Sequence, residues 1–172
     1  MPVLIIGTYD KNGVPDAMNA AWGGMFNEGL IGICLDKGHK TVANLLERKA
    51  FTVAVADADH LVPCDYVGIV SANDVDDKIR KSGLTPVKSA NVDAPVFDEL
   101  PMTLECELVS YSTETEQVVG RIVNVVADES VLTKGKPDPA KMKPITYDPV
   151  NHTYIQLGNV VGKAFSDGKK LS

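Results

Sequence analysis

The chain has 172 residues, 44% of them apolar, and a formal net charge of -6 at pH 7. This length predicts a single domain over residues 1–172, with a sizeable core but no room for a separate nucleotide-binding domain. The acidic balance argues against a nucleic-acid partner, because a protein that binds DNA or RNA needs a basic face for the phosphates. No apolar run approaches the length that spans a bilayer, so we also expect no membrane partner.

The cysteines indicate a reducing compartment. Cys34, Cys64 and Cys106 are odd in number and widely spaced, without a Cys-x-x-Cys pair. This favours free thiols over a disulfide framework or a zinc site, and we expect no bound metal. The chain starts directly in a strand-like pattern, without the basic start and long apolar run of a signal peptide. We therefore expect a cytoplasmic protein.

The pattern along the chain is rich in short strands, with a few helical segments between them. Residues 3–8 are apolar and β-branched, residues 10–13 have a hairpin-turn sequence, and residues 17–20 return as a second strand. The continuous apolar run at residues 30–35 predicts a central strand. Further strands are expected at residues 51–55, 102–108, 117–126 and 154–157, and helices at residues 42–48, 61–71 and 75–82. This composition of elements favours an antiparallel barrel over a doubly wound sheet.

Three of these segments carry specific expectations. In residues 102–108 apolar side chains alternate with Thr103, Glu105 and Glu107, which predicts a strand with its apolar face buried and its polar face in water. Pro63 must lie in the first turn of its helix. Residues 134–144 contain glycine and three prolines, which predicts an exposed loop able to reach a partner.

Residues 18–25 combine small side chains with one amide and the chain's only Trp, directly after a strand. Small side chains let the backbone approach a bound group closely, and Asn19 and Trp22 add hydrogen-bonding atoms and a flat apolar face. This combination suits a planar heterocycle with a polar edge. Taken alone, the segment is more typical of a turn around a buried Trp.

The start of the helix expected at residues 42–48 suits an anion. Gly38 permits a tight turn, Thr41 is the expected N-cap, and His39 and Lys40 bring groups that carry or can carry positive charge next to the helix amides. A phosphate is the expected guest, although an ordinary capped helix with a solvated Lys has the same pattern. A ring-binding and a phosphate-binding element so close in sequence point together to flavin mononucleotide (FMN).

These residues belong to a series of short motifs that runs nearly the whole length of the chain. The series comprises Thr8-Tyr9-Asp10, Asn12-Gly13, Asn19-Ala20-Ala21-Trp22-Gly23-Gly24, His39-Lys40-Thr41, Asp65-Tyr66-Val67-Gly68, Ser71, Asp77-Lys78-Ile79, Gly83-Leu84-Thr85-Pro86, Ala94-Pro95-Val96, Leu104-Glu105-Cys106-Glu107-Leu108, Leu157-Gly158 and Val161-Gly162-Lys163-Ala164-Phe165. In order and spacing it resembles the flavin reductase-like FMN-binding split-barrel proteins, and within them the flavoredoxin-type branch. The resemblance implies a mainly β protein with helical inserts, an antiparallel Greek-key split β-barrel. It also implies a homodimer with FMN at the subunit interface.

The same resemblance implies which residues hold the cofactor, and it assigns no catalytic residue. The expected contacts with the flavin ring and ribityl chain are Asn19, Ala20, Ala21, Trp22, Cys34 and Leu35, and those with the phosphate are His39, Lys40 and Thr41. The chain departs from the family pattern before the third strand. Many relatives carry a Pro-Pro segment there, whereas this chain has only the short segment of residues 26–29. The resemblance therefore assigns no flavin contact between Trp22 and Cys34.

Three functions fit these features. The first is an FMN-dependent oxidoreductase that takes hydride from NAD(P)H and passes electrons to free flavin, ferric iron or another acceptor. The second is a flavoredoxin-like electron carrier for a redox protein partner, and the third is a non-catalytic flavin-binding module. The sequence has no Gly-x-Gly-x-x-Gly fingerprint, so a nicotinamide cofactor would have to stack transiently on the flavin. The isolated His60 and His152 are expected to be structural.

Overall fold

The first two strands form a hairpin whose turn is closed by an aspartate. β1 (Leu4–Tyr9) pairs antiparallel with β2 (Pro15–Ala20). The Oδ1 atom of Asp10 accepts hydrogen bonds from two backbone N–H groups of the turn, at 2.8 and 2.9 Å, and Gly13 has a φ of 82°. A side-chain acceptor and a glycine in the left-handed region stabilise a tight turn. The predicted hairpin is therefore confirmed.

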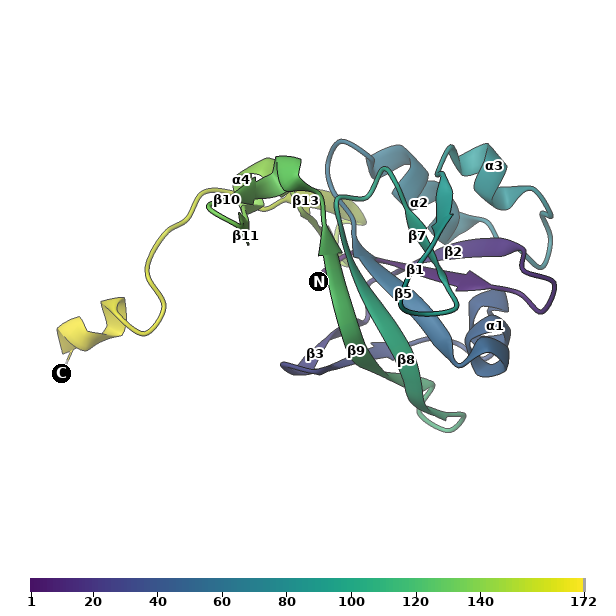
Figure 1. Ribbon diagram of the computed structural model, residues 1–172. Coiled ribbons are helices and arrows are strands. Elements are labelled where there is room, and N and C mark those ends of the chain that lie inside the picture. The colour runs from purple at the N-terminus through teal and green to yellow at the C-terminus, as the bar shows by residue number, and fades with distance from the viewer. Residues whose placement is uncertain (172) are drawn as a thin grey trace.

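Seven antiparallel strands form the main sheet, in the order β2-β1-β5-β8-β9-β4-β3, in a computed structural model that describes residues 1–171. Its other strands are β3 (Gly23–Asn27), β4 (Leu30–Cys34), β5 (Ala50–Val55), β8 (Met102–Ser112) and β9 (Gln117–Ala127). The sheet curls into a half-barrel (Figure 1). Its two edge strands, β2 and β3, follow each other in the chain, and Ala21 and Trp22 connect them. The mainly β, antiparallel split-barrel prediction is confirmed.

Helices and short hairpins cover this sheet. The helices are α1 (Lys40–Arg48), α2 (Leu61–Ile69), α3 (Lys78–Ser82) and α4 (Pro139–Met142), and the 3-10 turns are Glu129–Val131 and Asp167–Leu171. Three two-stranded ladders pair β6 (Pro86–Lys88) with β7 (Pro95–Phe97), β10 (Leu132–Thr133) with β11 (Lys136–Pro137), and β12 (Ile145–Asp148) with β13 (Thr153–Gln156). Pro63 lies in the first turn of α2, as predicted. Residues 70–71 and 75–77, expected to be helical, lie outside the helices.

The core has two parts because the central strands are buried on both faces. Successive side chains of a strand point to opposite faces of the sheet. In β1, Ile5 packs in one cluster with residues of α2 and α3, whereas Leu4 and Ile6 pack in the other with residues of α1. The helices therefore cover different faces of one sheet, with α1 on one face and α2 and α3 on the other. The ends of these helices can meet at the edge strand β2.

Two predictions are wrong, one about the place of a strand in the sheet and one about a loop. β4 is not central, because β3 pairs outside it and the sheet ends there. The glycines of residues 23–24 hid this edge strand, since glycine is depleted in strands. Residues 134–144 are not a plain loop, because they contain β11 and α4. Pro139 occupies the first turn of α4 behind the capping side chain of Asp138, a position where proline is well tolerated.

The polar face predicted for β8 is only partly exposed. Thr103 and Glu105 are 2% and 1% exposed, and only Glu107 lies in water. The pairing of β8 with β9 shifts register between Glu105 and Cys106, so the simple alternation does not hold through this point. The Glu105 carboxylate accepts hydrogen bonds from Ser89, Asn91 and Asn124. Burial by itself would raise its pKa, but these three donors hold the pKa below the ordinary value.

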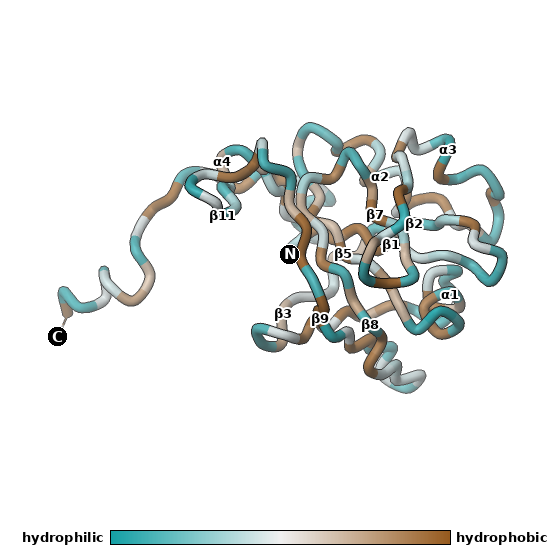
Figure 2. The backbone as a smooth tube through the Cα atoms, in the orientation of Figure 1, coloured by the Kyte–Doolittle hydropathy of each residue, from teal (hydrophilic) through white to brown (hydrophobic). Residues whose placement is uncertain are grey.

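The C-terminal segment leaves the body of the molecule. After β13 the chain runs outward to a short terminal turn (Figure 1), and it carries apolar stretches along its length (Figure 2). Val160, Val161 and Phe165 are 87%, 101% and 99% exposed. Within residues 1–171, no helix combines the length and apolar character needed to cross a bilayer.

Candidate functional site

Two adjoining cavities lie between β2, α1 and α2. The large chamber has a volume of about 410 Å³ and is lined by seven of the nine predicted site residues, together with four polar or aromatic residues from farther along the chain. The small chamber has a volume of about 130 Å³. Both are lined by Met18, His39, Gly68 and Ile69, so they form one continuous groove. The predicted residues in the large chamber are Asn19, Ala20, Ala21, Trp22, Cys34, Leu35 and His39, and those in the small chamber are His39, Lys40 and Thr41.

The start of α1 opens onto the small chamber. His39 is the N-cap residue, and its side chain makes no capping bond. Within residues 1–171 the backbone N–H groups of Lys40 and Thr41 have no acceptor. The prediction of Thr41 as the N-cap is wrong by two residues. Its hydroxyl instead donates to Asp16 Oδ2 at 3.1 Å, because Thr41 already lies inside the first turn and faces β2.

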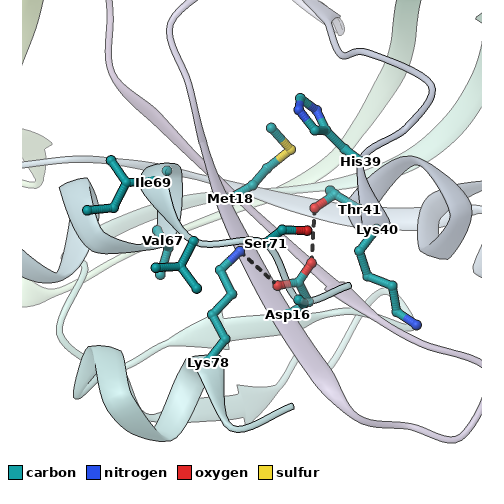
Figure 3. A pocket seen from close by; sticks show the side chains of 12 residues that line it. Asp16, Met18, His39, Lys40, Thr41, Val67, Ile69, Ser71 and Lys78 are labelled. Atoms are coloured by element: carbon teal, nitrogen blue, oxygen red, sulfur yellow. Dashed lines mark hydrogen bonds and ion pairs between the residues drawn. The ribbon is translucent and has the colours of Figure 1, made fainter. Parts of the chain in front are cut away.

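A buried ion pair forms the opposite side of this chamber. The Nζ atom of Lys78, on α3, lies 3.2 Å from Asp16 Oδ1, and both side chains are 4% exposed. The two groups form an ion pair, but Asp16 Oδ1 accepts no hydrogen bond from Lys78. Figure 3 shows Lys78 reaching towards Asp16, whereas the Lys40 side chain runs away from that pair. The cation held inside the chamber is therefore Lys78.

The sequence patterns did not single out this ion pair or Ser71. Lys78 stands in a polar run on a helix of five residues, and Asp16 follows the turn of a hairpin. Both patterns are typical of exposed side chains. The only signal was that Lys78, in Asp77-Lys78-Ile79, and Ser71 belong to the series of family motifs, which gave neither of them a role. Ser71 follows α2 and lines the same small chamber.

One wall of the large chamber is the link between the two sheet edges. Trp22 is 62% exposed, so the indole is not the buried Trp of an ordinary turn. Its backbone carbonyl accepts a hydrogen bond from the Cys34 N–H at 2.8 Å, which brings the end of β4 next to residues 19–22. The Cys34 side chain is exposed and Leu35 is buried. The predicted ring-binding residues are thus brought together on one surface.

The other wall comes from the β12–β13 hairpin. Tyr147, His152 and Tyr154 line the large chamber, with Asp65 of α2 beside them. The Tyr154 hydroxyl donates to Asp65 Oδ1 at 2.7 Å, and the Tyr147 hydroxyl lies 3.1 Å from His152 Nδ1. Burial, reinforced by the Asp65 carboxylate, raises the pKa of Tyr154 to about 12. The three hairpin residues are far from residues 19–22 in sequence, and no local pattern predicted them. Asp65 belongs to the motif Asp65-Tyr66-Val67-Gly68, which gave it no role.

Cys64, Cys106 and His60 do not line either chamber. Burial raises the pKa of both Cys64 and Cys106 to about 12. His60 Nδ1 contacts Asp57 at the start of α2. Residues 1–171 contain no group of three or more His, Cys, Asp or Glu side chains that could hold a metal ion.

Comparison with solved structures first defines the fold. A putative flavin reductase with a split-barrel domain, from Shewanella frigidimarina, matches with a TM-score of 0.80 at 18% identity, over 96% of this chain and 86% of that one. A likeness at this identity shows the fold alone: a split barrel. A comparison with curated protein sequences found no match.

The family follows from closer likenesses. Residues 1–150 match the flavin reductase like domain. The flavoredoxin of Desulfovibrio vulgaris (Miyazaki F) matches with a TM-score of 0.92 and 38% identity, over 97% of this chain and 92% of that one. The flavoredoxin from Methanosarcina acetivorans matches with a TM-score of 0.91 and 27% identity, over 100% and 92%. The chain belongs to the flavin reductase-like family.

Proposed function

We propose that this chain is an FMN-binding oxidoreductase. The observation that carries the proposal is the continuous groove of one large and one small chamber. FMN has one ring system and one phosphate, and the two chambers match these parts in order and number. An FAD molecule would need a further site for its second phosphate and its adenosine, for which the two chambers provide no third compartment.

The small chamber has the donors that a phosphate requires. The free N–H groups of Lys40 and Thr41 lie at the positive end of the α1 dipole. Lys78 brings an ammonium with three N–H donors, and Asp16 takes up only part of that capacity. Because Asp16 is paired with Lys78 and Thr41, its negative charge is offset before a phosphate arrives. We assign the phosphate to these groups, with His39 at the rim.

The large chamber suits the isoalloxazine ring and the ribityl chain. Asn19, Ala20, Ala21 and Trp22 form one side, and Cys34 and Leu35 continue it. A bound flavin supplies the redox chemistry by accepting and releasing a hydride or single electrons. The residues of this chain hold and orient the ring, and the aromatic wall of β12–β13 limits the access of water.

We further propose that NAD(P)H is the transient hydride donor, a proposal supported by the match of residues 1–150 to the flavin reductase like domain. A second candidate function is an electron carrier for a redox protein partner. It is favoured by the 38% identity to a flavoredoxin over nearly the whole chain. The two functions differ in whether a nicotinamide reduces the bound flavin directly.

Anaerobic stopped-flow mixing with NADH and NADPH tests this difference. The cofactor released from the purified protein is first identified by chromatography, and the protein is then loaded with FMN. Bleaching of the flavin absorbance at a rate that saturates with the nicotinamide supports the oxidoreductase. Slow, non-saturating reduction supports the carrier, whereas stoichiometric FAD or no flavin binding at micromolar FMN rejects both.

We also propose that the working unit is a homodimer with the FMN site at the subunit interface. Trp22, Met25 and Phe26 form an apolar surface beside the groove and are each more than half exposed. Contiguous exposed apolar surface of this kind marks an interaction site. The apolar C-terminal segment offers a second contact surface. A stable interface of this type buries on the order of 2,000 Å² in total.

A further inference from the structure

The side-chain amide of Asn19 is held in one orientation. Its Nδ2 atom donates to the backbone carbonyl of Cys64 at 3.1 Å. A carbonyl oxygen only accepts, so the amide atom facing Cys64 must be the nitrogen, and the oxygen must point the other way. The usual ambiguity between the two ends of an asparagine amide is therefore removed by its partner.

Tyr154 adds a second restraint on the same nitrogen. Asn19 Nδ2 lies 3.5 Å from the Tyr154 hydroxyl oxygen. The tyrosine gives its own proton to Asp65 Oδ1 at 2.7 Å, so a lone pair of its oxygen is left to face the amide. Asp65 thus fixes the direction of the Tyr154 hydroxyl, and Tyr154 in turn supports the direction of the Asn19 amide.

Close packing against α2 completes the restraint. A Cβ atom at Gly68 would lie 2.8 Å from Asn19 Cβ, which is closer than side chains approach one another. The absence of a side chain at Gly68 therefore allows α2 to lie directly against Asn19. Both residues line the large chamber.

The oxygen of this amide has no partner among the described residues. Within residues 1–171 Asn19 Oδ1 accepts no hydrogen bond, and it is not among the buried polar atoms that lack a partner. It is therefore an accessible acceptor on a residue that lines the large chamber. An acceptor held in advance favours a ligand that brings an N–H group to it, because a ligand without one leaves the oxygen unpaired.

We propose that Asn19 determines specificity by accepting a hydrogen bond from the imide N–H of the flavin ring, and that Tyr154 is a positioning residue for it. This inference rests on the proposed FMN function and adds which edge of the ring the protein reads. The hairpin that carries Tyr154 ends beyond residues 1–150, which match the family domain. Its contribution therefore belongs to the C-terminal part of this chain.

The test compares the binding of FMN with that of FMN methylated at the imide nitrogen N3. Wild-type protein is expected to bind the methylated flavin about tenfold more weakly, because the methyl group removes one hydrogen bond and crowds the oxygen that would accept it. In Asn19→Ala the ratio of the two dissociation constants falls close to one, and in Tyr154→Phe it falls part of the way. Tyr9→Phe removes a hydroxyl outside the groove and should keep the wild-type ratio.

A second readout does not depend on any variant folding. With ¹⁵N-labelled FMN bound to wild-type protein, the N3–H proton should be visible and slow to exchange with water. A rapidly exchanging N3–H proton, equal binding of both flavins by wild-type protein, or an unchanged ratio in Asn19→Ala overturns the assignment of Asn19 and leaves the FMN function standing. An unchanged ratio in Tyr154→Phe overturns only the positioning role. Failure of wild-type protein to bind either flavin rejects the FMN function itself.

Discussion

The ammonium of Lys78 lies 3.2 Å from the Oδ1 atom of Asp16, with both side chains 4% exposed. The other oxygen of the same carboxylate accepts a hydrogen bond from Thr41. Asp16 therefore joins β2 to α1 on one side and to α3 on the other, around the small chamber (Figure 3). Removing one member of a buried pair leaves an uncompensated charge, which typically costs about 3–5 kcal/mol.

Lys78→Met should weaken FMN binding about ten- to a hundredfold, because a charge-assisted hydrogen bond to phosphate contributes roughly 1.5–3 kcal/mol. The variant should also be less stable, since Asp16 loses its counter-charge. The double variant Asp16→Asn/Lys78→Met has no buried charge left, so it should regain most of the stability but not the affinity. Titration of flavin fluorescence and urea unfolding separate the two effects.

Lys81→Met is the matched control, because Lys81 lies on the same helix, is half exposed and pairs with Asp77. It should bind FMN as wild type does. Lys40→Ala should lose less affinity than Lys78→Met, since the Lys40 side chain runs away from the Asp16–Lys78 pair (Figure 3). A larger loss in Lys40→Ala would show that Lys40, which the sequence indicated, is the main cation that binds the phosphate.

Glu105→Gln should lower the free energy of unfolding by roughly 1.5–3 kcal/mol at neutral pH. The amide of Gln places N–H donors against Asn91 and Asn124, which themselves donate to the carboxylate. Glu107→Gln, two residues along β8, removes an exposed carboxylate 3.8 Å from Arg121 and should change little. Urea unfolding of both variants measures the difference. Equal effects at the two positions would contradict a special role for Glu105.

The stability of the wild-type protein should also depend on Glu105 in acid. Its folded-state pKa is held below the ordinary value of 4.5. The carboxylate therefore contributes its full stabilisation above pH 4.5, and this is lost as the pH falls through the lower folded-state pKa. Unfolding measured from about pH 6 to about pH 3 should show a smaller acid loss in Glu105→Gln than in wild type. Parallel curves would show that Glu105 does not titrate in this way.

Cys34 should be the one thiol of the native protein that reacts with iodoacetamide near neutral pH. It is exposed, whereas Cys64 and Cys106 are buried and have pKa values raised to about 12, so their thiols stay protonated. Because Cys34 lines the large chamber, bound FMN should slow the reaction. Peptide mass spectrometry locates the label. Fast labelling of Cys64 or Cys106 would show that the core opens.

Val161→Asp should weaken self-association without lowering the stability of one subunit. Val161 is fully exposed in the single chain, so a charge there costs nothing unless a partner covers it. Val150→Asp changes another highly exposed valine, in the turn between β12 and β13, and serves as the control. Light scattering of FMN-loaded protein at micromolar concentration reports the assembly. A stable wild-type monomer that retains FMN would contradict the dimer.

The sequence determined the features that depend on near neighbours. The β1–β2 hairpin follows from Asp10 and Gly13, whose conformations are local, and its prediction was confirmed. Residues 19–22 and 34–41 are linked by one short hairpin, so their meeting along one groove also follows from local order. The mainly β, antiparallel class follows from many short strands, each with its own signal.

The tertiary structure decided which polar side chains are buried. Lys78, Asp16 and Glu105 all have the sequence signal of an exposed residue, and each is 4% exposed or less. A charged side chain can be buried only when partners from other elements replace its water, and those partners lie far away in the chain. For the same reason Tyr154 reaches Asn19 and Asp65 only after β13 folds back onto α2. The side chains that complete and orient the site are therefore set by the packing of distant elements, which no local pattern encodes.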